Sequence, residues 1–223
     1  MRAEVSAGSP RNSIIDFWSG LDRRETVHPS DKPVIERVGT RDLILDRYLP
    51  QPFMGPLKTA RIVLLYLSPG ISDTDANELT SEAEIARCER QRSGIEPMPG
   101  VGEHPNAWRW WSSRAKWLGN PELLRIRIAI FELGAYHSKD GYHDLLLSLP
   151  STRAAVDWAQ TMLFPDAISG NKLVLCLRAP RYWGLRAGQR YGMGLFAPAT
   201  TRNGYIADRP IREEILTVAR SFG

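Results

Sequence analysis

The chain has 223 residues, of which 43% are hydrophobic and 24% charged, so its composition is that of an ordinary globular protein. Its 29 basic and 25 acidic residues leave a net charge of +4, which permits binding to a polyanion without requiring it. The two cysteines belong to no CxxC or Cys/His cluster, so the sequence predicts no metal site. The longest apolar run, 62–67, is too short to span a bilayer, and the first residues lack a signal peptide's apolar stretch. We therefore expect a soluble, cytoplasmic protein without a membrane partner.

Residues 1–47 are predicted to form an N-terminal helical arm. Short helical patterns lie at 14–21 and 41–49, and the turn-forming HPSDKP stretch separates them. The next segment, 48–56, contains three prolines and one glycine, and it is expected to be extended and irregular. An α/β domain is predicted to follow over 48–223.

Four apolar runs of strand length are distributed along this domain. They cover 61–67, 125–133, 172–178 and 194–198. Continuous apolar runs suit strands that are buried on both faces. Because helical patterns separate the runs, the sequence predicts a three-layer α/β/α sandwich with a central, mostly parallel four-stranded sheet. Ligands bind beyond the carboxyl ends of such strands, so the loops that follow the strands are the candidate sites.

The helices between the strands are predicted from caps and apolar stripes. Asp75 and Glu78 have the spacing of a reciprocal cap at a helix start. Asn106 is the expected cap of a tryptophan-rich helix over 107–118, and Trp110 lies off the apolar stripe of that helix. The remaining two helical patterns follow Ser151 and Pro210.

The loop after the first strand, SPGISDTD, is not a phosphate-binding loop. It has one glycine and no lysine, and Asp73 and Asp75 precede the expected helix. Carboxylates there repel a phosphate, so we expect no dinucleotide or other cofactor. The two aspartates either hold a water or a cation, or they only cap the helix and complement its dipole.

The loop after the second strand carries two of the four histidines. Its polar residues include His137, Ser138, Asp140 and His143. A Ser/His/Asp relay is conceivable, but no nucleophile-elbow glycine pattern surrounds Ser138. The alternative is a solvated turn.

The last two loops combine arginine with aromatic residues. Arg178 and Arg181 precede Tyr182 and Trp183, and the later TTRNGYI stretch spans 200–206. Arginine beside planar side chains suits phosphate contact and base stacking. The alternative is a solvated basic face, with Trp183 in the core.

In this order, the motifs resemble those of the uracil-DNA glycosylase superfamily. They are PxPFxG at 50–55, a strand ending in YLSPG at 66–70, FELGAYHS at 131–138 and TTRNGYI at 200–206. Mismatch-specific members carry a glycine, a hydrophobic residue and Asn-Pro-Gly where this chain has YLSPG. The resemblance covers about residues 48 to 222. It implies the fold of that superfamily, with DNA as the partner.

The resemblance also implies a function: hydrolysis of the N-glycosidic bond of a damaged or deaminated base flipped out of DNA. Ser68 occupies the position of the residue that positions the water, where the family carries Asn, Asp or Glu. Asp73 is the nearest carboxylate in the sequence. The implied substrate-binding residues are Pro69, Gly70, Tyr136, His137 and Ser138. The implied DNA-binding residues are Arg178, Arg181, Arg202 and Asn203.

Two alternatives remain open at this point. The first is a non-catalytic nucleic-acid-binding protein on the same fold. The second is a small-molecule hydrolase on a doubly wound sheet, with Asp73, His137 or His143 as acid and base.

Overall fold

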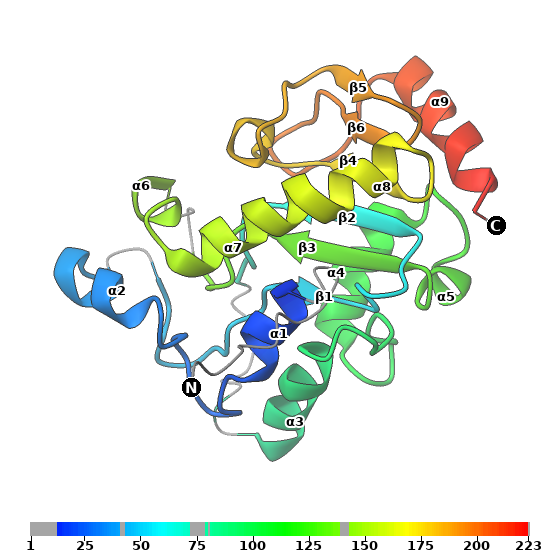
Figure 1. The fold of residues 1–223 in the computed structure, drawn as a ribbon. Coiled ribbons are helices and arrows are strands. Elements are labelled where there is room, and N and C mark those ends of the chain that lie inside the picture. The colour runs from blue at the N-terminus through cyan, green and yellow to red at the C-terminus, as the bar shows by residue number, and fades with distance from the viewer. Residues whose placement is uncertain (1–12, 41–42, 72–78, 80, 139–142, 223) are drawn as a thin grey trace, which may run out of the picture.

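The protein is built around a six-stranded mixed sheet with strand order β1-β3-β2-β4-β6-β5 (Figure 1). The computed structural model describes residues 13–40, 43–71, 79, 81–138 and 143–222. The strands are β1 (Phe53–Met54), β2 (Ile62–Tyr66), β3 (Ile128–Glu132), β4 (Leu173–Cys176), β5 (Gln189–Tyr191) and β6 (Leu195–Ala197). The four predicted strands are the central ones, β3, β2, β4 and β6, and they pair in parallel.

The α/β class is confirmed, but the predicted strand number is wrong. The sheet has six strands because β1 and β5 add an antiparallel edge on either side. These edge strands have two and three residues, which is too short for a periodic apolar pattern to reveal them.

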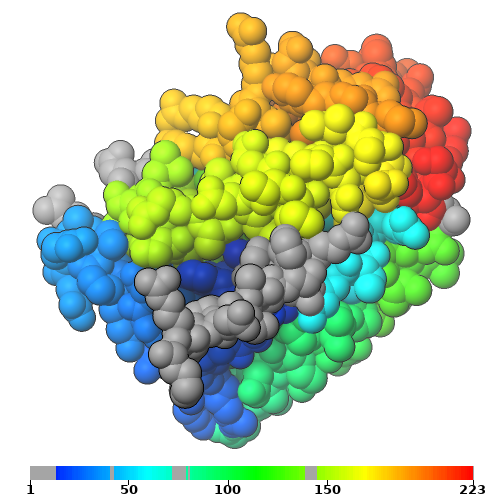
Figure 2. Space-filling view, viewed as in Figure 1, coloured from blue at the N-terminus to red at the C-terminus, as the bar shows by residue number. Residues whose placement is uncertain are grey.

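Helices cover both faces of the sheet. One face packs against α1 (Ser13–Ser19), α7 (Pro150–Trp158) and α8 (Phe164–Ile168), which lie on the viewer's side in Figure 1. In Figure 2, α7 and α8 form a continuous yellow-green band across this side of the molecule. The other face packs against α4 (Pro105–Ala115), α5 (Pro121–Leu124) and α9 (Arg209–Arg220). Three further helices in the described part of the chain are α2 (Lys32–Val38), α3 (Glu82–Gln91) and α6 (His143–Leu146). No helix in the described part of the chain is long and apolar enough to cross a membrane.

The described part of the N-terminal segment packs into the same core as the sheet. Ile14 and Trp18 of α1 are buried in one cluster with the side chains of β2 and β3. Asp31 is fully buried: its Oδ2 accepts the Tyr136 hydroxyl at 2.5 Å and its Oδ1 accepts the Ser151 amide at 3.0 Å. This carboxylate therefore links the start of α2 both to the turn after β3 and to the start of α7.

The helix predicted over 41–49 is wrong in its described part. Residues 43–49 form no helix and bend at 46–47, and the Ile44 amide donates to the His137 carbonyl at 3.0 Å. Leu43 forms a bridge with Ser138. Tertiary pairing with the turn after β3 thus overrides the local helical pattern.

Helix α4 begins two residues before the position expected from the sequence. Its cap is His104, whose Nδ1 accepts the Ala107 amide at 3.1 Å, and Pro105 follows at the first helical position. Proline has no amide to satisfy there, so the helix begins at Pro105 and Asn106 lies inside it. The other predicted cap, formed by Asp75 and Glu78, lies outside the described residues.

Candidate functional site

A cavity of about 690 Å³ lies at the carboxyl end of β3, on the face of the sheet that α4 covers. Glu84 and Arg87 of α3 line one side of it, and four other parts of the described chain complete the lining. They are the segment around β1, the turn at Pro69–Ile71, the end of β3 with His137, and α4 with the loop before it. The cavity is therefore at the edge of the sheet where parallel α/β folds bind their ligands.

Glu132 lines the sheet side of the cavity. It is the last residue of β3 and is 6% exposed, and alternation along the strand places it on the same face as Ile130. Its Oε2 is buried and accepts no hydrogen bond from the described residues. Burial raises the pKa of Glu132 to about 8, while the positive charge of Arg178 acts in the opposite direction. The carboxyl is therefore mainly protonated at neutral pH and has a proton to donate.

Tyr66 is the neighbour of Glu132 across the sheet. The two residues are register partners at the ends of β2 and β3. The Tyr66 hydroxyl is also buried without a hydrogen-bond partner among the described residues, and burial raises its pKa. A buried polar atom without a partner is uncommon and costs about 1–3 kcal/mol. Of the two residues, Glu132 lines the cavity, so its carboxyl is where a ligand or water can supply the missing hydrogen bond.

His137 joins the turn after β3 to the turn after β2. Its Nδ1 lies 2.9 Å from the Gly70 carbonyl oxygen. Because a carbonyl only accepts, Nδ1 carries the hydrogen. The ring stacks on Tyr48 with centroids 4.5 Å apart and planes 24° apart. The structure thus brings Pro69, Gly70 and His137 together in the lining of one cavity.

The other predicted catalytic and substrate-binding residues lie beside the cavity or away from it. Ser68 and Ser138 face each other with their hydroxyl oxygens 3.4 Å apart, and neither lines the cavity. Tyr136 is buried in the core on the opposite face, where its hydroxyl is bound to Asp31. Asp73 lies outside the described residues.

Two of the four predicted DNA-binding residues lie at a second hollow of about 500 Å³. Arg178 and Arg181 line this hollow, and Arg178 also donates to the Arg202 carbonyl. Arg181 stacks over the Tyr182 ring at 4.7 Å. Arg202 and the adjacent Asn203 are exposed. Trp183, in contrast, is fully buried in the core, as its alternative interpretation predicted.

Sequence reasoning missed the contribution of α4. Trp110, which lies off the apolar stripe, lines the cavity with its ring 5.3 Å from the Tyr66 ring. The Arg114 guanidinium lies 4.6 Å above Trp110 and 5.7 Å from the Tyr205 ring. The position of Trp110 outside the apolar stripe of the helix was the sequence signal for this contribution, because a large apolar side chain outside the core stripe needs another contact.

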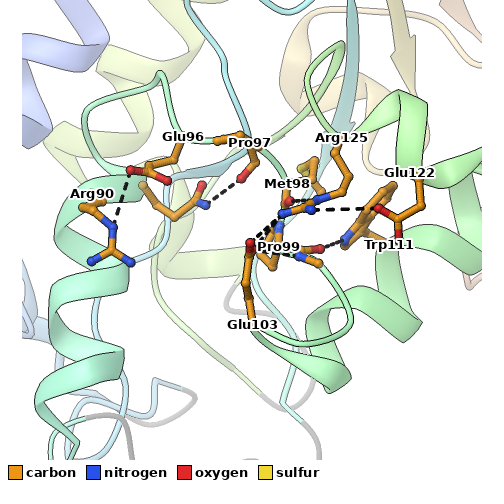
Figure 3. A network of polar contacts seen from close by, with 11 residues as sticks. Arg90, Glu96, Pro97, Met98, Pro99, Glu103, Trp111, Glu122 and Arg125 are labelled. Atoms are coloured by element: carbon orange, nitrogen blue, oxygen red, sulfur yellow. Dashed lines mark hydrogen bonds and ion pairs between the residues drawn. The ribbon is translucent and has the colours of Figure 1, made fainter.

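Polar contacts fix the loop that forms one wall of the cavity (Figure 3). Arg125 donates to the Met98 carbonyl and to the Glu103 carboxylate, each at 2.8 Å. Glu103 also accepts the Gly100 amide at 2.9 Å, and these hydrogen bonds lower its pKa. Trp111 adds a hydrogen bond from its indole nitrogen to the Pro99 carbonyl at 2.9 Å. The wall is therefore anchored to both α4 and the start of β3.

The chain was also compared with known proteins. No protein-family model, curated protein or solved structure matched it significantly. Within the described ranges, no group of three or more His, Cys, Asp and Glu side chains is placed to hold a metal ion. The chemistry of the cavity is therefore the basis for assigning a function.

Proposed function

We propose that the protein is a DNA glycosylase-like hydrolase on a uracil-DNA glycosylase-like fold, and that the cavity beside α4 receives the flipped base. The observation that carries this proposal is the buried Glu132 carboxyl, which lines an aromatic-walled cavity and has an oxygen without a partner among the described residues. The order of the loop motifs along the sequence supports the same assignment.

The cavity walls suit a flat heterocycle. Tyr48, Phe53 and Trp110 supply aromatic surfaces, and Ile130 and Met54 supply apolar ones. Stacking on one aromatic contributes about 1–3 kcal/mol per base, which is comparable to the cost of extracting a damaged base from the duplex. The protonated Glu132 can then donate a hydrogen bond to an oxygen or ring nitrogen on the base edge.

Glu132 also suits the departure of the base. In N-glycosidic hydrolysis the bond from the sugar C1′ to the base nitrogen breaks, and its electron pair leaves with the base. A carboxyl with a pKa of about 8 holds its proton at neutral pH and can donate it to the leaving base. Water then adds to C1′, and the proton that this water loses restores the Glu132 carboxyl. Ser68 and Asp73 remain the predicted residues for positioning that water.

Base release from damaged duplexes tests this proposal. Duplexes carrying uracil, hypoxanthine or xanthine are incubated with the protein and cleaved by alkali at abasic sites. We expect cleavage of at least one duplex by the wild type and a loss of about 100-fold or more in E132Q, because general acid catalysis contributes about 10²–10⁴. E213Q is the matched control, since Glu213 is exposed on α9 and pairs only loosely with Arg209. Absence of cleavage with every duplex would refute the enzymatic assignment.

A non-catalytic nucleic-acid-binding protein is the second candidate. The placement of Ser68 favours it, because the Ser68 hydroxyl faces Ser138 and does not line the cavity. This candidate predicts binding of the same duplexes without base release. Its affinity should fall steeply with salt, since neutralised phosphates release counterions. Binding that persists at high salt would contradict it.

A further inference from the structure

The arginines of α4 are the charged groups of the cavity that the proposed function leaves unexplained. Arg109 and Arg114 both line the cavity. The other ionic side chains on this rim are paired: Arg87 lies 2.7 Å from Glu84, and Glu103 lies 2.8 Å from Arg125. Neither Arg109 nor Arg114 forms an ion pair with a carboxylate in the described part of the chain.

Arg114 is held in place while part of its donor capacity stays unused. Its guanidinium lies over Trp110 and near the Tyr205 ring, and its Nη1 donates to the Trp110 carbonyl at 3.0 Å. Its Nε is buried and donates to none of the described residues. A guanidinium has five N–H donors in a rigid fork, so one that is fixed by two aromatic rings is preorganised for an oxyanion.

The surroundings favour a phosphate as that oxyanion. Glu132, the carboxyl on the sheet side of the cavity, is mainly uncharged at neutral pH and does not repel an anion. A volume of about 690 Å³ lies within the range that holds a whole drug-sized ligand, so a base leaves room for its sugar and phosphate. Arginine binds phosphate through charge-assisted hydrogen bonds that are frequently bidentate.

We infer that Arg109 and Arg114 form a phosphate subsite, which holds the phosphate attached to the sugar of the base in the cavity. This inference rests on the proposed function, because it places the phosphate relative to a bound base. The phosphate belongs either to DNA or to a free nucleotide, and both present the same chemistry to the two arginines.

Calorimetric titration with deoxyuridine and with deoxyuridine 5′-monophosphate tests the subsite. We expect the monophosphate to bind about tenfold more tightly than the nucleoside, since a hydrogen bond to a charged group is worth a factor of this order. R109Q should remove this gain and leave nucleoside affinity unchanged, because Arg109 is exposed and its replacement does not disturb packing. R114Q should remove the gain as well. R212Q is the matched control, because Arg212 also lies over a tryptophan, 5.2 Å from the Trp117 ring, but outside the cavity.

Two results would overturn the inference: an unchanged gain in both R109Q and R114Q, or an equal loss of nucleoside and nucleotide affinity. The nucleoside could instead bind in a Glu132-dependent manner while the monophosphate binds no more tightly than the nucleoside. That result would refute the subsite and leave the proposed function standing. Conversely, inorganic phosphate that binds the wild type but not R114Q, with no binding of either nucleoside or nucleotide, would support the anion site and refute the base-binding function.

A second set of titrations identifies the source of the phosphate. A uracil-containing duplex is compared with the monophosphate in the wild type, R109Q and R114Q. Weakened duplex binding in the two variants assigns the subsite to a DNA phosphate, and weakening of the monophosphate alone assigns it to a free nucleotide. No weakening with either ligand would overturn the subsite.

Discussion

Replacing Glu132 by glutamine should change how stability depends on pH. In the folded protein this carboxyl stays protonated up to about pH 8, whereas in the unfolded chain it ionises near its ordinary pKa of 4.5. Between these values the unfolded chain holds one proton fewer, so the free energy of unfolding of the wild type falls as pH rises. The limiting slope is about 1.4 kcal/mol per pH unit.

From about pH 5.5 to about pH 7.5, this slope amounts to about 2.5 kcal/mol once partial titration at both ends is included. Glutamine keeps the shape of the side chain but does not titrate. The free energy of unfolding of E132Q minus that of the wild type should therefore rise by about 2.5 kcal/mol over this interval. Any effect of the amide on packing is the same at both pH values and does not alter this rise. Urea unfolding of both proteins at the two pH values measures the difference.

E103Q is the control for this experiment. The pKa of Glu103 is lowered by the Gly100 amide and Arg125, so this carboxyl is ionised in both the folded and the unfolded protein throughout the interval. The stability difference between E103Q and the wild type should not vary with pH. A constant difference for E132Q, or one that falls as pH rises, would show that Glu132 is ionised in the folded protein and would refute the reasoning.

Three further substitutions test the supports of the site. Tyr136→Phe removes a hydrogen bond from the buried Asp31 and should lower the free energy of unfolding by about 1–3 kcal/mol, as measured by urea denaturation. An unchanged denaturation midpoint would contradict the link between Tyr136 and Asp31. Gly204→Ala should lower the free energy of unfolding by about 1 kcal/mol or more, because Gly204 has a φ of +79° and the added Cβ would lie 3.2 Å from the Tyr66 ring. An unchanged free energy of unfolding would argue against this backbone conformation. Arg125→Gln should speed amide exchange at Gly100 while the sheet stays protected, and unchanged exchange would show that the wall needs no such anchor.

The central part of the fold was predictable from local apolar pattern. The runs that became β2, β3, β4 and β6 are continuous and apolar because their side chains are buried on both faces of the sheet. The edge strands lack such a pattern because they are short, and β5 is largely exposed. The non-helical segment at 43–49 was mispredicted because its pairing with the turn after β3 is a tertiary contact.

The site was predictable in its location more than in its residues. A parallel sheet gathers the loops after its strands at one edge, so the convergence of Gly70 and His137 follows from topology. The inward direction of Tyr136 does not, since a turn has no fixed side-chain period. Glu132 was hidden for a related reason: it ends an apolar strand, and only the packing of α4 over that face turns it into a cavity residue.

A crystal structure of the protein with a uracil-containing oligonucleotide tests the central claim most directly. We expect the base to lie between Tyr48 and Trp110, with one of its polar atoms within hydrogen-bonding distance of Glu132. A base seated instead in the hollow lined by Arg178 and Arg181, with the cavity beside α4 unoccupied, would contradict it.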